Sequence, residues 1–208
     1  AIVAGYDYLI DKYNIEIIEL NESVNFNDKF SLKGFGKLTI SKRIFDFDYI
    51  INIPKLKAHT QLLFTAGVKN LFGCVVGKRK PLRHLLAFHN VERFAFMLLK
   101  NAQKINPLLT IVDGIWAMAK TGPQDGEAIN LGMLIIGENP IAVDFAIAKL
   151  LNIDLQKAPI LKIAKQFNFP DNEIEVLMDD IELPKRFLVP ENLEDISFDL
   201  FRVIKSVI

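Results

Sequence analysis

Several features are scarce or absent in this 208-residue sequence, and each absence excludes a class of protein or a kind of site. The single cysteine, Cys74, excludes an internal disulfide and any iron–sulfur cluster or zinc site held by cysteines of this chain alone. Net charge is also absent, because 25 basic residues balance 25 acidic ones, which argues against nucleic-acid binding. Half of the residues are apolar, so the chain is not disordered and can bury a sizeable core.

Long apolar runs are missing as well. Stretches such as 131–137 fall far short of the roughly 18 to 20 residues that span a bilayer. No charged-then-apolar leader is recognisable, so we expect a soluble, cytoplasmic protein with no membrane segment. Because the sequence starts with alanine and not methionine, we also expect it to be part of a longer protein.

Strands and helices are expected to alternate along the chain. Runs of aliphatic and β-branched residues predict strands, and apolar residues at helical spacing predict helices. The predicted strands are 15–20, 38–40, 49–53, 108–112 and 129–136. The predicted helices are 62–72, 82–105 with a break near Asn90, 140–151 and 158–167. This order predicts an α/β fold with a layered parallel or mixed sheet flanked by helices.

Two further expectations concern the core and the domain boundaries. The near-continuous apolar run 49–53 is typical of a strand covered on both faces, and Trp116 is expected in the core. We expect an α/β domain over 1–170 that is incomplete at its N-terminus. Residues 171–208 hold ten acidic residues and are expected to pack on this domain or to form a small lobe.

Acidic residues are missing altogether between Asp48 and Glu92. This interval instead holds seven fixed positive charges and all three histidines: Lys55, Lys57, Lys69, Lys78, Arg79, Lys80, Arg83, His59, His84 and His89. Clustered cations attract phosphate or carboxylate, and ligands of open α/β sheets bind at the carboxyl ends of strands. The segment 54–60 follows a predicted strand, and Thr60 is expected to cap the next helix. A solvated basic surface is the alternative interpretation.

Two carboxylates and a glycine-rich loop form a second candidate group. Asp113 ends a predicted strand, and Gly122 lets the following loop approach a ligand, although its Pro-Gln-Asp-Gly sequence also fits an ordinary turn. Asp144 lies one turn inside the predicted helix 140–151, where structural pairing with a lysine or an amide is the alternative to ligand binding. The spacing of histidines and carboxylates does not predict a metal site.

Several separated motifs, in order along residues 36–152, resemble those of the DUF362 family. They are Ile51-Asn-Ile-Pro-Lys-Leu-Lys-Ala-His-Thr60, Gly67-Val-Lys-Asn-Leu-Phe-Gly73, Ile111-Val-Asp-Gly114, Thr121-Gly-Pro123 and Asn139-Pro-Ile-Ala-Val-Asp144. That family comprises prokaryotic proteins of unassigned function, many of them described as iron–sulfur proteins. The resemblance implies a role for the motif residues Lys55, Lys57, His59, Lys69, Asn70, Asp113, Gly122, Pro123 and Asp144. The Cys-x-x-Cys module that many members carry is not in this sequence.

Two hypotheses about function follow, and the sequence does not decide whether the protein is an enzyme. In the first, a concave basic site binds a small anion, phosphate or carboxylate, in the service of a redox or iron–sulfur system. Its ligand-binding residues would be Lys55, Lys57, Lys69, Asn70, Arg79, Arg83, Gly122 and Asp144. His59 or Asp113 would move a proton. In the second, a non-catalytic interaction domain docks an acidic partner such as a ferredoxin-like module. The sequence does not identify a cofactor, and it excludes only an iron–sulfur cluster held by this chain alone.

Overall fold

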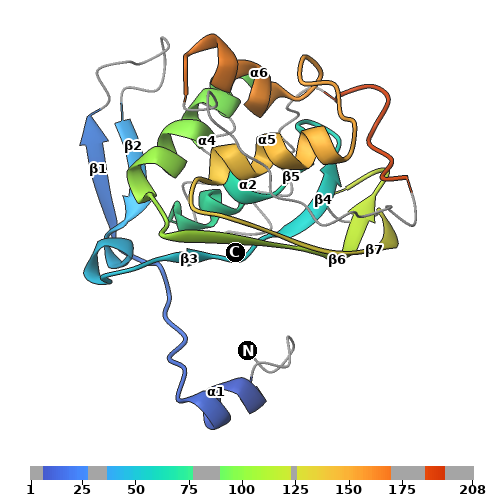
Figure 1. Ribbon diagram of the computed structural model, residues 1–208. Coiled ribbons are helices and arrows are strands. Elements are labelled where there is room, and N and C mark those ends of the chain that lie inside the picture. The colour runs from blue at the N-terminus through green and yellow to red at the C-terminus, as the bar shows by residue number, and fades with distance from the viewer. Residues whose placement is uncertain (1–6, 28–36, 77–89, 123–125, 170–185, 195–208) are drawn as a thin grey trace, which may run out of the picture.

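The computed structural model describes residues 7–27, 37–76, 90–122, 126–169 and 186–194 (Figure 1). Its strands are β1 (Ser23–Asn27), β2 (Lys37–Ser41), β3 (Ile51–Asn52), β4 (Lys55–His59), β5 (Leu63–Thr65), β6 (Leu109–Ala119) and β7 (Glu127–Gly137). Its α-helices are α1 (Asp7–Tyr13), α2 (Gly67–Asn70), α4 (Val91–Ile105), α5 (Pro140–Leu150) and α6 (Pro159–Gln166). Two 3-10 helices are η2 (Lys42–Asp46) and η3 (Leu71–Cys74).

The main sheet has five strands and is mixed, as the sequence predicts. Its order is β3-β6-β4-β5, and β7 also pairs with β6. Strands β3 and β4 run parallel to β6, whereas β7 is antiparallel to β6 and β5 is antiparallel to β4. A separate antiparallel ribbon joins β1 and β2. The fold is therefore α/β, with helices flanking a mixed sheet.

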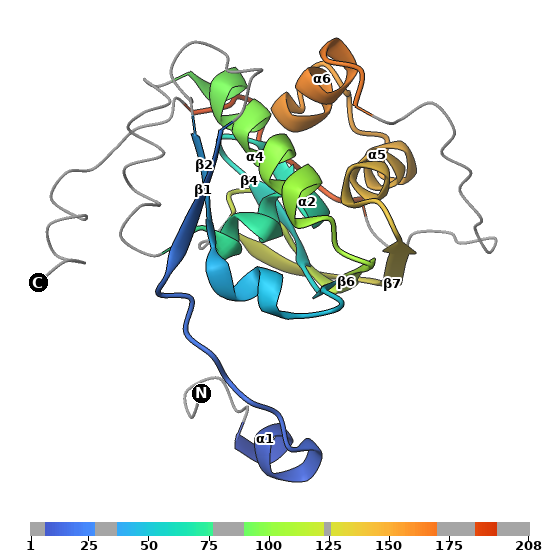
Figure 2. The ribbon, with the colours of Figure 1, turned by 90° about the vertical axis from the view of Figure 1, so that its left-hand side faces the viewer.

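The described helices α2, α4, α5 and α6 gather on one side of the main sheet (Figures 1 and 2). Side chains that point to this side are buried, among them Leu56, Val112 and Leu131. Capping fixes where two of these helices begin. The side chains of Asn90 and Asn139 each accept a hydrogen bond from a backbone amide of the first turn of α4 and α5. The hydrophobic core thus lies between these helices and one face of the sheet.

The opposite face of the sheet carries no described helix, and we call it the bare face. Strand side chains alternate between the two faces, so every second residue of β3, β4, β6 and β7 belongs to it. Its members include Ile51, Lys55, Lys57, Ile111, Asp113, Leu134 and Ile136, and Ile53 continues the alternation between β3 and β4. The expectation that the run 49–53 is covered on both faces is therefore wrong for the described residues, because Ile51 and Ile53 are exposed.

Two predicted elements differ in the structure. Residues 15–20 form no strand; they belong to an extended arm that joins α1 to β1 and leaves Ile15 and Ile17 exposed. The segment 62–72 is not one helix but β5, the short α2 and η3. Its residues 62–68 are all buried, so it lacks the polar face that a partly exposed helix has. Thr60 consequently lies at a turn before β5 and caps no helix.

Strands β6 and β7 are longer than predicted, at 11 residues each. Asp113 therefore lies inside β6 and not at its end, directly before an irregularity in the pairing between Gly114 and Trp116. An extra residue at such a bulge redirects the side chains that follow it. Trp116 is accordingly 54% exposed, which corrects its expected place in the core.

Of the acidic segment 171–208, the structure describes residues 186–194. The Lys120 amide donates a hydrogen bond to the Leu188 carbonyl at 2.7 Å, and the Glu194 amide donates to the Thr60 carbonyl at 2.8 Å. Phe187 is buried against the core. These residues thus adjoin the end of β4 that carries His59. The boundary at residue 170 stays a prediction.

Candidate functional site

Strand β4 places three of the predicted site residues in one row. Lys55, Lys57 and His59 are at alternate positions, so their side chains leave the strand on the same side, the bare face. Ile51 and Ile53 precede them in the same alternation. The row therefore begins with the apolar residues Ile51 and Ile53 and continues with basic residues, of which Lys55 is the first.

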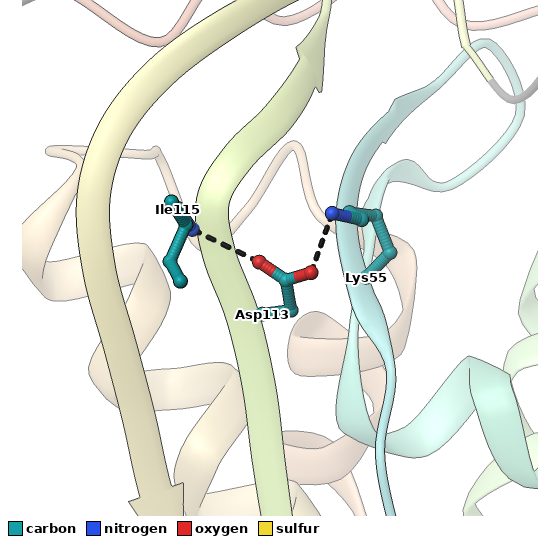
Figure 3. A network of polar contacts seen from close by, with 3 residues as sticks. All are labelled: Lys55, Asp113 and Ile115. Carbon is teal, nitrogen blue, oxygen red and sulfur yellow. Dashed lines mark hydrogen bonds and ion pairs between the residues drawn. The ribbon is translucent and has the colours of Figure 1, made fainter. Parts of the chain in front are cut away.

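An ion pair lies at the centre of the bare face. Lys55 and Asp113 are partners in the parallel pairing of β4 with β6, and the Lys55 ammonium donates to Oδ2 of Asp113 at 2.5 Å. The Ile115 amide donates to Oδ1 of the same carboxylate at 3.0 Å. Figure 3 shows the carboxylate held between these two donors. Both charged side chains are partly exposed, so the pair meets solvent on one side.

This arrangement fixes the charge state of Asp113. The hydrogen bond from Lys55 is the main cause that lowers the pKa of the Asp113 carboxyl below its usual value, and the backbone amides of Ile115 and Trp116 act in the same direction. A carboxyl with a lowered pKa is ionised near neutral pH and is a weak proton acceptor. Asp113 is therefore better suited to balance the charge of Lys55 than to carry protons.

Lys57 is the cation of the row that no described residue neutralises. It pairs through its backbone with Thr65 of β5 and Met118 of β6, and its side chain is partly exposed. It forms no ion pair with any residue that the structure describes. A positive charge at this place attracts an anion without first breaking an internal pair.

His59 ends the row and is nearly buried. Its Nδ1 accepts a hydrogen bond from the Gln61 amide at 3.1 Å. A neutral imidazole that accepts at one nitrogen carries its proton on the other, so this contact assigns the proton to Nε2. The ring orientation is thus set by the turn that follows β4.

The buried face of the same sheet holds a second polar group, built around Asn52. The Asn52 amide nitrogen donates to the Gly67 carbonyl at 2.9 Å and to Oγ1 of Thr110 at 3.3 Å. Its oxygen accepts from the Asn70 side chain at 2.8 Å. Asn52 is a residue of this group that was not predicted from the sequence. The signal was a single amide within the apolar run 49–53, because buried amides in such runs need partners.

Asp144 belongs to this buried group. It is 1% exposed, and its two oxygens accept hydrogen bonds from the amides of Gly67 at 2.7 Å and Val68 at 3.2 Å. These amides open α2, which has no side-chain cap of its own, so a residue of α5 caps it from outside. Burial raises the pKa of the Asp144 carboxyl to about 7, against the opposing effect of the Val68 and Gly67 hydrogen bonds.

The predicted site residues therefore divide between the two sides of the sheet. Lys55, Lys57 and Asp113 lie on the bare face. Asn70 and Asp144 lie on the helix-covered side, where Asn70 binds Asn52 and Asp144 binds the first amides of α2. Lys69 is also on that side, with its ammonium 4.6 Å from the centre of the Phe72 ring. The expectation of one concave cluster is wrong for these residues. Arg79, Arg83 and Pro123 lie outside the described residues.

Gly122 has a backbone role that its sequence position only hinted at. A Cβ atom on this residue would lie 1.8 Å from the Ala58 carbonyl oxygen, far inside van der Waals contact. Its own carbonyl accepts a hydrogen bond from the Thr60 amide at 3.1 Å. Glycine is thus required for the turn that follows β6 to lie against the end of β4.

Other kinds of site find little support among the described residues. No three His, Cys, Asp or Glu side chains there gather as ligands for a metal ion. Two surface pockets involve none of the predicted residues; one includes Asn106 and Glu138, the other Asp154 and Arg186. No helix in the described part of the chain is long and apolar enough to cross a membrane.

The fold and the motif residues define an α/β domain whose mixed sheet has helices on one side. The profile of DUF362, described as a domain of unknown function, matches residues 1–149. The chain belongs to the DUF362 family, as its motifs indicate.

A relative of this chain is the thylakoid-associated protein sll1697 of Synechocystis sp. (strain ATCC 27184 / PCC 6803 / Kazusa). The two are 36% identical over 207 residues. The match covers 97% of this chain and 63% of the relative, so the chain spans less than two thirds of that protein's length. No solved structure matches this chain.

Proposed function

We propose that this domain binds a small anion, phosphate or carboxylate, at the basic end of the bare face, with Lys57 as its principal contact. One observation carries the proposal: β4 aligns Lys55, Lys57 and His59, and Asp113 neutralises the first of these cations only. Lys57 then presents a charge that no described residue pairs. An anion there gains a charge-assisted hydrogen bond.

The neighbouring residues have distinct roles in this proposal. Lys55 adds to the positive potential only when its pair with Asp113 opens. His59 is oriented by the Gln61 amide, and it is the candidate for moving a proton because an imidazole titrates near neutral pH. Gly122 holds the adjoining loop against β4. Asp144 and Asn70 keep the helix-covered side together and do not contact the ligand.

A thermal-shift titration tests this proposal. Inorganic phosphate, pyrophosphate and citrate are titrated against the wild-type protein, Lys57→Ala and Lys149→Ala, an exposed lysine of α5 that serves as the matched control. A ligand at ten times its Kd stabilises the folded state by about 1.4 kcal/mol, or roughly 3–6 °C for a chain of this size. We expect this shift in the wild type and in Lys149→Ala but not in Lys57→Ala. Equal shifts in all three proteins would contradict the proposal.

Asp113→Asn provides a second and more specific test of the proposal. Removing the carboxylate frees the Lys55 ammonium, so two cations without a partner among the described residues face the ligand instead of one. We expect phosphate to bind several-fold more tightly to Asp113→Asn than to the wild type. Weaker binding would mean that the carboxylate itself contacts the ligand, in conflict with the charge-balancing role.

The finer parts of the earlier hypotheses remain proposals. Service to a redox or iron–sulfur system needs a cluster from outside these 208 residues, since they hold one cysteine. Docking of an acidic, ferredoxin-like partner would use the same cations and would weaken steeply with salt. A cytoplasmic location is also proposed. Because the relative is thylakoid-associated, cell fractionation is the test of that location.

A further inference from the structure

The apolar half of the bare face forms a continuous patch across three strands. Ile51 pairs with Leu109, and Ile111 pairs with Ile136, while Leu134 lies beside Asp113. Four aliphatic side chains of the patch are between 54% and 66% exposed: Ile51, Ile53, Leu134 and Ile136. Tyr49 and Trp116 extend it at either end with exposed rings. The patch therefore has the apolar composition of a protein core, although its side chains are exposed.

Such a face is unusual for a sheet of this kind. All-parallel sheets have layers on both faces, and antiparallel sheets that leave one face in water carry polar residues there, whereas half of this face is apolar. Apolar patches this continuous on soluble proteins mark places where another surface packs. The charges within the patch are consistent with burial, because Lys55 and Asp113 already neutralise each other. Lys57 lies at the margin, where it can stay in contact with solvent.

A second apolar feature lies on the same side of the molecule. The arm formed by α1 and residues 14–22 extends away from the body on the bare-face side in both views (Figures 1 and 2). Tyr8, Tyr13, Ile15 and Ile17 on this arm are 45–64% exposed. The apolar side chains of the arm and of the bare face are thus exposed on the same side of the molecule, in a region that no described residue fills.

We infer that a further layer of the same polypeptide covers the apolar half of the bare face and packs against the arm. The length of the relative is consistent with such a layer, because more than a third of that protein lies outside the part that matches this chain. The layer would present aliphatic side chains to Ile53 and Ile136 and would end near Lys57. The edge where it meets β4 would then form the wall of a cleft. Ligand sites are common at such boundaries. The inference does not depend on the proposed anion site.

Thiol labelling tests the inference on the protein as the cell makes it. Ile53→Cys is introduced into the 208-residue chain and into the complete polypeptide that its gene encodes. Modification is read on the peptide that contains residue 53, which separates it from Cys74 and other cysteines. We expect labelling at position 53 to be at least tenfold slower in the complete polypeptide. Leu134→Cys is the second probe, in case Ile53→Cys perturbs folding.

Lys149→Cys, an exposed position on α5, is the matched control and is expected to react equally fast in both proteins. Equal labelling of residue 53 in both proteins would overturn the inference, as would a reading frame that encodes nothing beyond these 208 residues. Protection of residue 53 from labelling that increases with the concentration of the 208-residue chain would instead show that a second copy of the chain covers the bare face. Phosphate titration of the same proteins reports separately on the anion site.

Discussion

The two faces of the main sheet use polar residues in opposite ways. On the helix-covered face, Asn52 and Asp144 are buried and each binds backbone or side-chain partners on α2. On the bare face, Lys55 and Asp113 form a partly exposed pair amid exposed aliphatic side chains. Buried hydrogen bonds are costly to break, whereas exposed ion pairs contribute little to stability. The difference indicates that the polar residues of the covered face stabilise the fold, whereas the ion pair of the bare face contributes little to stability.

The largest expected effect comes from the contact between the turn after β6 and the end of β4. Gly122→Ala places a methyl group 1.8 Å from the Ala58 carbonyl oxygen, so the backbone of that turn or of β4 must move. We expect a loss of more than about 4 kcal/mol of unfolding free energy, which belongs to the exceptional range for single substitutions. Urea denaturation measures it.

Gly73→Ala is the matched control, because a Cβ atom there meets nothing within 4 Å. We expect its unfolding free energy to lie within about 0.5 kcal/mol of the wild type. A similarly small change for Gly122→Ala would show that the close approach of residue 122 to β4 is not required.

The next effect is a pH dependence that originates on the helix-covered face. The folded-state pKa of Asp144 is raised to about 7, so the folded protein keeps a proton that the unfolded chain releases above pH about 4. Stability from this group is therefore complete below pH about 4 and falls as the pH rises to about 7. By linkage the fall amounts to about 4 kcal/mol. Urea unfolding between pH 4 and pH 8 measures it.

Asp144→Asn should remove this slope, because the amide does not titrate in this range. It also sets an NH2 group against the Gly67 or Val68 amide, which we expect to cost about 1–3 kcal/mol at pH 4. Asp11→Asn, a change at an exposed aspartate of the arm, should keep the wild-type slope. Persistence of the slope in Asp144→Asn would assign it to another group.

The smallest effect is expected on the bare face. Lys55→Met removes a partly exposed ion pair and keeps the aliphatic stem, so the unfolding free energy should change by less than about 1 kcal/mol. The same change should raise the pKa of Asp113 toward its usual value, because Lys55 is the main cause of its lowering. Carboxyl chemical shifts followed by NMR during a pH titration measure it. An unchanged pKa would mean that the pair does not persist in solution.

Sequence patterns predicted the class of fold, but they did not predict that the described helices cover only one face of the sheet. Local periodicity predicted the strands near 38–40, 49–53, 108–112 and 129–136. It also predicted the helical residues that follow the break near Asn90 and the helix that begins at Pro140. The short run 49–53 could not show which of its side chains faces a covering layer. That depends on tertiary packing, and its apolar residues look alike whether a layer covers them or not.

The candidate site was predictable in part, for a similar reason. The acid-free interval includes β4, where alternation alone aligns Lys55, Lys57 and His59. Proximity across the chain was not predictable: the pairing of Asp113 with Lys55 depends on the register between β6 and β4. The role of Asp144 as an external cap of α2 likewise requires a contact 77 residues away in sequence.

The most direct test compares neighbouring residues on opposite faces of the same continuous stretch of chain. Ile53 is 66% exposed on the bare face, and Leu56 is 0% exposed on the covered face. Urea unfolding of Ile53→Ala and Leu56→Ala in the 208-residue chain gives both costs under the same conditions. The account predicts a loss of about 2–5 kcal/mol for Leu56→Ala and less than about 1 kcal/mol for Ile53→Ala. Comparable losses would contradict it, because Ile53 would then already be packed within this chain.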